Sequence, residues 1–208
     1  MSPGSGTGVG EAGLALLAPL RADPGRAAIF TDVDGTLAPI AERPELAAVP
    51  ARSAEVLAAL GERFGMVGCI SGRRAEEARR LVGVEGIAYA GNHGLELLLP
   101  GDEAPRLDPS LRDREDGAAE FVAGLGAESL GAGLRLEDKG PIQALHWRGA
   151  ADERAAESQA RQIAAAAGRA GLEPRWGRKV LELRPVGGGG KDAAVAALLA
   201  TDGVVAAI

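Results

Sequence analysis

Short apolar runs alternate with helix-like segments along the first half of the chain. Pro50–Leu60 and Arg74–Leu81 carry apolar residues at helical spacing, and Gly61 is the expected stop of the first of these helices. The apolar runs around them end abruptly at polar or Gly-rich residues, as strands buried on both faces do: Ala27–Thr31, Met66–Ile70 and Gly86–Ala90. This alternation predicts a parallel sheet with right-handed crossovers, in which the ligand lies beyond the carboxyl ends of the strands.

The pattern changes after Leu95. Pro100–Pro109 has the composition of a loop, and segments that indicate helices and short strands follow it. The predicted helices are Asp116–Leu125 and Asp152–Ala170, and the predicted strands are Gly133–Asp138, Gln143–Trp147 and Arg178–Leu183. Two strands joined by a tight turn, then a helix and another strand, predict a small α+β insertion with an antiparallel sheet. The parallel pattern resumes after Pro185, with a helix at Lys191–Ala200 and an apolar run at Val204–Ile208.

Composition narrows the class of function. A length of 208 residues fits one large domain or two interleaved small ones, and a hydrophobic fraction of 46% excludes a wholly disordered chain. The net charge of −6 argues against a nucleic-acid partner, and an aromatic content of 3% argues against stacking clefts. A single cysteine, Cys69, excludes an intrachain disulfide and fits a reducing compartment. No apolar run approaches the roughly 20 residues of a membrane span, so we expect a cytoplasmic protein with no membrane partner.

The strongest chemical signal is the segment Asp32–Leu37, which reads Asp-Val-Asp-Gly-Thr-Leu and directly follows the first predicted strand. Two carboxylates two residues apart at a strand end can serve different roles, one as a nucleophile and the other as a proton shuttle. Gly35 lets the backbone turn sharply, which leaves amide groups free to meet an anion. Asp and Gly also end strands without any chemistry, but the preceding strand and the following Thr-Leu favour the catalytic interpretation.

This segment resembles the first motif of the haloacid dehalogenase superfamily of aspartate-dependent phosphatases. Ser71, at the end of the next strand, and Lys191, at the start of a later helix, match the second and third motifs of that superfamily. Within it, the chain is most similar to the trehalose-6-phosphate phosphatase family, from about residue 29 to residue 208. The closer likeness is carried by Ser71-Gly72-Arg73, Asn92-His93-Gly94, Glu137-Asp138-Lys139, His146-Trp147-Arg148 and Glu182-Leu183-Arg184-Pro185.

The resemblance implies a mechanism. Asp32 would attack phosphorus and form an aspartyl-phosphate, while Asp34 would protonate the departing sugar oxygen and then deprotonate the hydrolytic water. Ser71 would donate a hydrogen bond to the phosphoryl group, and Lys191 would balance its charge and that of Asp32. The implied cofactor is Mg²⁺, with the Asp32 carboxylate and the Asp34 backbone carbonyl as two of its ligands.

The resemblance also implies residues that bind the substrate. Glu137, Lys139 and Glu182 of a cap domain would hydrogen-bond the sugar, and the remaining candidates are Gly35, Thr36, Gly72, Arg73, Asn92 and His93. A spacing of two puts Glu137 and Lys139 on one strand face, and strand alternation puts Glu182 on the polar side of its strand. Exposed strand faces commonly carry Glu and Lys, so a purely structural role stays open for these three. Ser71 could equally cap the helix that follows it.

We therefore expect an α/β fold, a three-layer Rossmann-like parallel-sheet core with an inserted α+β cap domain. Residues 1–25 are a lead-in with a disordered tail at Met1–Gly10, residues 26–95 and 186–208 form the core, and residues 96–185 form the cap. Val204–Ile208 is expected to lie beside the first strand. The family places a fourth, acidic Gly-Asp-Asp-type motif directly after this strand, where the printed sequence ends. We expect the 208 residues alone to bind Mg²⁺ weakly and to associate through an open sheet edge.

The expected function is Mg²⁺-dependent hydrolysis of trehalose 6-phosphate in trehalose biosynthesis, with a functional link to a trehalose-6-phosphate synthase. One alternative is a phosphatase for another sugar phosphate, because only cap residues distinguish the two. The other is a non-catalytic fragment that binds a sugar phosphate or a partner synthase without turnover. An acidic continuation of the coding sequence beyond Ile208 would favour the enzyme.

Overall fold

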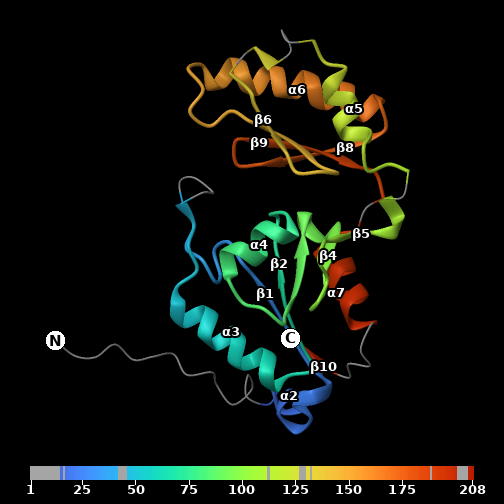
Figure 1. The fold of residues 1–208 in the computed structure, drawn as a ribbon. Coiled ribbons are helices and arrows are strands. Elements are labelled where there is room, and N and C mark those ends of the chain that lie inside the picture. Colours follow the sequence, from blue (N-terminus) through green and yellow to red (C-terminus); the bar gives the residue numbers. More distant parts are fainter. Residues whose placement is uncertain are drawn as a thin grey trace, which may run out of the picture.

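The chain folds around two separate β-sheets, one above the other in the view of Figure 1. The structure is a computed structural model that describes residues 15, 17–41, 46–111, 113–126, 130–131, 133–187, 189–200 and 206–208. The predicted disordered tail, Met1–Gly10, lies outside these residues. Within the described ranges, none of the helices has the length and apolar character that a bilayer crossing requires.

The lower sheet has six strands in the order β10-β1-β2-β3-β4-β5. Its strands are β1 (Ala27–Asp32), β2 (Met66–Ile70), β3 (Ala88–Gly91), β4 (Glu96–Leu98), β5 (Arg106–Leu107) and β10 (Ala206–Ala207). The pairs β10–β1, β1–β2 and β2–β3 are parallel, which confirms the predicted parallel core, and β10 lies beside β1 as expected. β4 and β5 add antiparallel strands at the other edge, so the predicted start of the cap at residue 96 is too early.

Helices cover both faces of this sheet and make the three layers that the sequence predicts. Its helices are α2 (Ala18–Ala22), α3 (Ala51–Arg63), α4 (Ala75–Val82) and α7 (Lys191–Leu199), with the short turn η1 (Pro24–Arg26) before β1. On one face, Leu57 of α3 and Ala78 of α4 pack against Val67 and Tyr89. On the opposite face, Leu198 of α7 joins the neighbouring strands in a second apolar cluster.

Gly61 does not end α3, contrary to the sequence prediction. The helix continues to Arg63, and the Phe64 amide closes it by donating to the Leu60 carbonyl at 2.9 Å. A Cβ atom at position 61 would lie 3.1 Å from Cγ2 of Ile87. Glycine therefore allows close packing of α3 against Ile87 at this position. It does not mark the end of the helix.

The upper sheet has four antiparallel strands in the order β6-β7-β9-β8. Its strands are β6 (Arg135–Asp138), β7 (Gln143–His146), β8 (Leu172–Gly177) and β9 (Val180–Pro185), and its helices are α5 (Gly117–Ala123) and α6 (Glu153–Arg169). Both helices pack on the face that points away from the lower sheet (Figure 1). This is the α+β cap that the sequence predicts. β8 was not predicted, because Pro174 and its charged neighbours hide the strand pattern of an edge strand.

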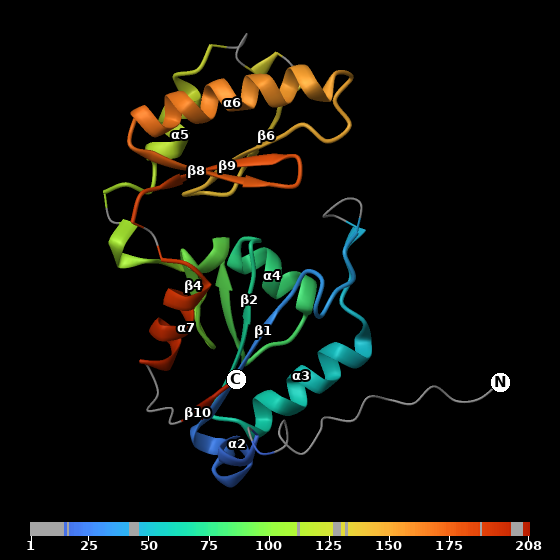
Figure 2. The same ribbon diagram turned by 180° about the vertical axis from the view of Figure 1, so that it is seen from behind.

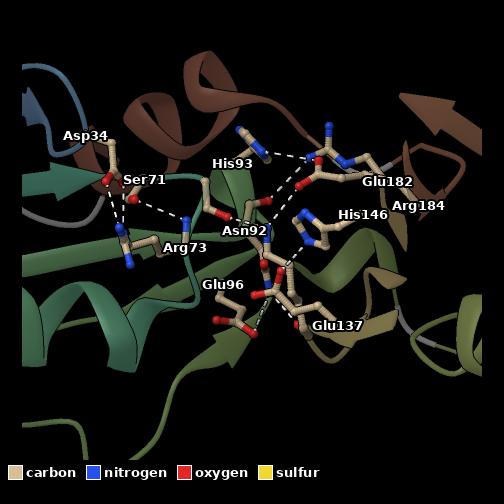
Figure 3. A network of polar contacts seen from close by, with 12 residues as sticks. Asp34, Ser71, Arg73, Asn92, His93, Glu96, Glu137, His146, Glu182 and Arg184 are labelled. Atoms are coloured by element: carbon tan, nitrogen blue, oxygen red, sulfur yellow. Dashed lines mark hydrogen bonds and ion pairs between the residues drawn. The ribbon is translucent and has the colours of Figure 1, made fainter. Parts of the chain in front are cut away.

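Alternation along β9 separates an apolar face of the cap from a polar one. Leu181 and Leu183 are buried under the cap helices, whereas Glu182 and Arg184 are half-buried on the other side of the strand. Glu137 and Glu182 both pair with Ala144 of the strand between them, so their side chains share one face. The predicted polar position of Glu182 is confirmed. The polar face of the cap is turned toward the core sheet (Figure 3).

The chain crosses between the sheets at one side of the molecule (Figure 2). The outgoing segment contains the turn η4 (Pro109–Leu111), and the returning segment follows β9. Hydrogen bonds tie the two crossings together, from Ser110 Oγ to the Gly187 carbonyl at 3.2 Å and from Arg114 Nη1 to the Val186 carbonyl at 3.0 Å. The cap is thus attached to the core by two adjacent segments.

Candidate active site

The carboxyl ends of β1, β2 and β3 bring the predicted motifs to one edge of the core sheet. Asp32 is the last residue of β1, Ser71 follows β2, and the short turn η3 (Asn92–Gly94) follows β3. Adjacent parallel strands end at the same edge of a sheet, so residues far apart in sequence meet there. Figure 3 shows Asp34, Ser71 and Arg73 on one side of this region and residues of the cap on the other.

The turn after β1 is tight. Gly35 has a φ of +88°, a left-handed conformation that favours glycine, and its amide donates to the Ala38 carbonyl at 2.7 Å. The Thr36 amide donates to the Val33 carbonyl at 3.3 Å. The prediction that the turn leaves these amides free to meet an anion is therefore wrong for Gly35 and Thr36, because the turn itself uses them.

Lys191 lies against the first aspartate of the motif. It is the first residue of α7, and its Nζ donates to Asp32 Oδ1 at 2.6 Å although 159 positions separate the two residues. The side chains are 45% and 40% exposed, so the pair opens to solvent and can accept a third charged group. The structure thus brings together the predicted nucleophile and the predicted charge-balancing lysine.

The second aspartate is held by an arginine. Arg73 binds Asp34 through two nitrogens, with Nε to Oδ2 at 2.9 Å and Nη2 to Oδ1 at 2.8 Å. The same guanidinium donates to Glu77 Oε1 at 2.6 Å. The hydrogen bond to Asp34 is the largest influence on Arg73 and raises its pKa, despite partial burial of the guanidinium. Bidentate guanidinium–carboxylate pairs have a fixed geometry, and the same fork fits a phosphate group.

Ser71 is buried, and its hydroxyl oxygen accepts a hydrogen bond from the Arg73 amide at 3.1 Å. It does not cap α4, because that helix begins later, with Arg74 as its N-cap residue. Glu96 Oε2 instead accepts from the amide of Ala75, the first residue of the helix, at 2.9 Å. The capping alternative for Ser71 is therefore wrong, and the carboxylate that supports the helix start comes from β4.

The η3 turn binds the loop that follows β2. Asn92 and His93 have φ values of 50° and 60°, left-handed conformations that are uncommon outside glycine. Their amides donate to the carbonyls of Arg73 and Ser71, at 2.6 Å and 2.9 Å respectively. These bonds lock the two loops into one surface beneath the cap.

The cap contributes a buried ionic group above this surface. Lys139 Nζ donates to Glu182 Oε1 at 2.9 Å and to the carbonyl of Gly72 in the core at 2.7 Å. His93 Nε2 lies 3.3 Å from the other oxygen of Glu182. Burial raises the pKa of Glu182, but hydrogen bonds from His93 and Lys139 and the charge of Lys139 outweigh burial and lower it to about 2. Glu182 is therefore an anion held between the cap and the core.

Glu137 has a different partner from Lys139. Its Oε2 lies 2.6 Å from Nε2 of His146, and this hydrogen bond lowers the pKa of Glu137. β6 ends at Asp138, so Lys139 lies in the following turn rather than on the strand face with Glu137. The spacing argument for a shared strand face fails for this reason, although both side chains line the same cavity.

The cavity between the core edge and the cap has a volume of about 940 Å³. The predicted site residues that line it are Asp34, Gly72, Arg73, Glu137 and Lys139. The other predicted site residues do not line the cavity but lie at the strand ends and in the contacts described above: Asp32, Gly35, Thr36, Ser71, Asn92, His93, Glu182 and Lys191. Residues that the sequence analysis did not place in the site also line it: Ile40, Ala41, Glu77, His146, Arg148, Arg178 and Lys179.

Comparison with known proteins decides the family. A family model described as trehalose-phosphatase matches residues 30–205. The chain belongs to the trehalose-phosphatase family. A trehalose-phosphate phosphatase of Mycobacterium avium is 37% identical over 165 residues, which cover 76% of this chain and 40% of that protein. An uncharacterized glycosyl hydrolase of Mycobacterium tuberculosis is 40% identical over 162 residues, which cover 77% of this chain and 12% of that protein. The chain thus spans less than half of these relatives.

Solved structures agree with this membership in the trehalose-phosphatase family. A trehalose-6-phosphate phosphatase related protein has a TM-score of 0.63 and 26% identity, covering 82% of this chain and 72% of its own. The C-terminal domain of Candida albicans trehalose-6-phosphate phosphatase has a TM-score of 0.64 and 21% identity, covering 88% and 64% of the two chains. The second likeness concerns the fold alone. A haloacid dehalogenase-like hydrolase of Bacteroides thetaiotaomicron, with a TM-score of 0.57 and 14% identity, shares the fold.

The end of β1 offers oxygen atoms of the kind that can hold Mg²⁺. Within the described part of the chain, His, Cys, Asp and Glu side chains form no group of three that could hold a metal ion. The Asp32 carboxylate and the Asp34 backbone carbonyl are hard oxygen donors, and Mg²⁺ is commonly held by one or two carboxylates together with substrate phosphate and water. The donor set at the end of β1 therefore fits Mg²⁺ in chemical kind.

Four of the cavity residues that the sequence analysis missed fall into two groups. His146 and Arg148 belong to a motif that carries the family resemblance, so they could have been proposed as site residues from that motif. Arg178 and Lys179 lie in the turn between β8 and β9, and that hairpin could not be placed because β8 was not predicted.

Proposed function

We propose that this chain hydrolyses trehalose 6-phosphate to trehalose and phosphate, with Mg²⁺, through an aspartyl-phosphate on Asp32. The observation that carries the proposal is the meeting of Asp32 with Lys191 and of Asp34 with Arg73 at the end of β1, below a polar cap face. Membership in the trehalose-phosphatase family supports the substrate.

In the first step, a carboxylate oxygen of Asp32 attacks phosphorus as the bond from phosphorus to the sugar oxygen breaks. Asp34 takes up a proton when the substrate phosphate displaces it from Arg73, and it gives that proton to the departing oxygen, which leaves as a trehalose hydroxyl group. In the second step, Asp34 takes a proton from water, and the resulting hydroxide attacks the phosphorus of the aspartyl-phosphate. Phosphate leaves and the Asp32 carboxylate is restored, so each step balances in atoms and charge.

Cations and donors of this chain stabilise the charge that moves during both steps. Lys191 stays beside Asp32, and the Ser71 hydroxyl donates to a phosphoryl oxygen. Arg73 exchanges Asp34 for the incoming phosphate, which presents the same paired oxygens to the guanidinium fork and frees Asp34 for proton transfer. Mg²⁺ held by Asp32 and the Asp34 carbonyl would supply further positive charge for the phosphoryl oxygens.

The sugar is a neutral group rich in hydroxyls, so its recognition needs donors and acceptors rather than net charge. Glu137 supplies acceptors and Lys139 supplies donors from the cap side of the cavity, and Glu182, which does not line it, holds the Lys139 ammonium group. The cavity of about 940 Å³ falls in the size range of small-molecule sites, which supports a substrate larger than phosphate itself.

A non-catalytic sugar-phosphate or partner-binding role is the alternative from another class. The C-terminal domain of a Candida albicans trehalose synthase regulatory protein has the same fold, with a TM-score of 0.60 and 13% identity. The contact of Lys191 with Asp32 favours the enzyme, because binding alone requires no cation against a half-exposed carboxylate at the strand end.

Phosphate release from trehalose 6-phosphate, with and without Mg²⁺, tests the proposal. We expect Asp32→Asn to lower turnover by at least about 10³-fold, because an amide is a poor nucleophile. Asp23→Asn, at an exposed aspartate before β1, is the matched control and should keep wild-type turnover. Turnover retained in Asp32→Asn would overturn the covalent mechanism. Equal rates on glucose 6-phosphate and trehalose 6-phosphate would overturn the assigned sugar, and binding without turnover would favour the alternative role.

A further inference from the structure

Contacts between cap and core converge on a single asparagine of the η3 turn. Asn92 Nδ2 donates to the backbone carbonyl of Lys139, in the β6–β7 turn of the cap, at 2.7 Å. The Asn92 carbonyl accepts from Arg184 Nη2 of the cap at 3.3 Å. Asn92 is fully buried, and Figure 3 shows it between core and cap residues. This side chain is therefore placed to dock the β6–β7 turn on the core.

A buried carboxylate of the core determines which way the Asn92 amide faces. Glu96 Oε1 accepts from Asn92 Nδ2 at 2.9 Å, so this NH₂ group serves Glu96 and Lys139 together. An ionised carboxylate only accepts hydrogen bonds, which forces the nitrogen end of the amide toward Glu96. Asn92 Oδ1 is buried and has no hydrogen-bond partner among the described residues, so Glu96 and Lys139 alone orient this amide.

Glu96 has no part in the proposed chemistry, yet it is only 3% exposed. A carboxylate that deep in a protein is unfavourable unless its oxygens are hydrogen-bonded. Glu96 Oε2 accepts from the Ala75 amide at the start of α4, and Nε of Arg74 lies 3.8 Å from Oε1. Glu96 thus links the first turn of α4 to Asn92 and, through Asn92, to the cap.

We propose that Glu96 is a positioning residue for sugar recognition. It orients Asn92, Asn92 docks the β6–β7 turn through the Lys139 carbonyl, and the docked turn holds Lys139 Nζ against Gly72 and Glu182. The docking part of this inference concerns only the fold of this chain. Its effect on substrate choice rests on the proposed function.

The first test is Glu96→Gln. The Ala75 amide and Asn92 Nδ2 donate to different oxygens of Glu96, and glutamine has an NH₂ group in place of one of them, so one of the two donors would face another donor. We expect kcat/KM for trehalose 6-phosphate to fall about tenfold, mainly through KM, while kcat/KM for p-nitrophenyl phosphate changes less than about twofold. Glu85→Gln, at a largely exposed glutamate that follows α4, is the matched control and should change neither value.

A double-mutant cycle tests whether Glu96 acts through Asn92. Asn92→Gly removes the amide but tolerates the left-handed backbone at this position. The Asn92→Gly variant should lose the same preference for the sugar phosphate, and adding Glu96→Gln to it should cause no further loss. Losses that multiply would overturn the proposal. If Glu96→Gln fails to fold, the Asn92→Gly variant alone still tests docking through the amide.

Hydrogen–deuterium exchange tests docking without any turnover. The Lys139 amide donates to the Ile142 carbonyl across the β6–β7 turn, and we expect exchange in this turn to accelerate about tenfold in Glu96→Gln but not in Glu85→Gln. The exchange rate separates the docking role of Glu96 from the proposed phosphatase function, because it reports on docking even if trehalose 6-phosphate is not the substrate. A lower melting temperature with unchanged exchange and an unchanged substrate ratio would make Glu96 a purely structural carboxylate.

Discussion

Two lysine–carboxylate pairs, one in the core and one in the cap, have the same chemistry in different surroundings. Lys191 and Asp32 lie 2.6 Å apart with side chains 45% and 40% exposed. Lys139 and Glu182 lie 2.9 Å apart with side chains 10% and 14% exposed. Exposed pairs contribute little stability and exchange partners readily, whereas removing one partner of a buried pair leaves a costly unpaired charge. The comparison suggests that the core pair is built to react and the cap pair to hold a shape.

The surrounding groups fit this division. Lys191 has the Asp32 carboxylate as its partner at the open end of β1, where a phosphate can enter. Lys139 is held by the Gly72 carbonyl as well as by Glu182, and His93 holds the other oxygen of Glu182. Each member of the cap group therefore has its orientation fixed before any substrate arrives, which reduces the entropy that binding must overcome.

Matched lysine substitutions give the largest expected effect. Lys191→Ala should lower kcat/KM about 10²–10³-fold for trehalose 6-phosphate and for p-nitrophenyl phosphate alike, since both have a phosphoryl group to stabilise. Lys139→Ala should lower kcat/KM for trehalose 6-phosphate at least about tenfold and leave the aryl ester within about threefold, because Lys139 is a cap residue and its proposed ligand is the sugar. Steady-state kinetics on both esters check this, and equal losses from Lys139→Ala would contradict a sugar-reading role.

Acid titration of Glu182 should give the next largest effect. Its pKa falls from an ordinary 4.5 to about 2 in the folded chain, so its stabilising contribution is complete above about pH 4.5 and declines as the pH falls toward 2. The decline amounts to about 1 kcal/mol by pH 3.5 and about 3 kcal/mol at the limit. Urea unfolding between pH 6 and pH 3.5 measures the loss as a slope of the unfolding free energy against pH, and this slope should be smaller in Glu182→Gln than in the wild type by that amount.

Glu173→Gln is the control for this titration. Glu173 lies on the adjacent strand β8 and pairs with Arg175 at 2.7 Å on the surface, where an ion pair contributes little. This variant should keep the wild-type slope. If Glu182→Gln keeps the slope as well, the buried cap pair is not the source of the acid sensitivity.

Gly72→Ala should have the smallest effect. It tests whether His93 of the core holds Glu182 of the cap. A Cβ atom at Gly72 would lie 2.7 Å from Cε1 and 2.9 Å from Nε2 of His93, so the imidazole must move away from Glu182. We expect KM for trehalose 6-phosphate to rise about threefold with little change in kcat. Gly168→Ala, in α6 with nothing within 4 Å, should leave KM unchanged and stabilise the chain by up to about 1 kcal/mol. A KM unaffected by Gly72→Ala would mean that His93 is not needed to hold Glu182.

The parallel core could be predicted because its strands are buried on both faces and therefore appear as continuous apolar runs. Met66–Ile70 matches β2 residue for residue, with each of its positions buried. The antiparallel strands β4 and β5 were missed because they are short, and the second is only two residues long. Short strands carry too few positions for alternation to be recognised, and only their pairing partners define them.

The site divides in the same way. Asp32, Asp34 and Ser71 could be placed together from the sequence, because parallel strands must end at the same edge. The pairing of Glu137 with His146, and the use of Glu96 to support α4, depend on contacts between segments that no local pattern joins. Glu96 lies in the three-residue strand β4, directly after the turn η3, and this segment has no sequence pattern that would mark the glutamate as part of the site.

The buried thiol of Cys69 can report how often the core sheet opens. The thiol is fully buried in β2, between β1 and β3, and burial together with the charge of Asp32 raises its pKa to about 12. Only the thiolate reacts with alkylating reagents, so burial in the closed sheet suppresses the reactive form at neutral pH. As Cys69 is the single cysteine of the chain, the labelling rate of the whole protein measures how often the sheet beneath the active site separates.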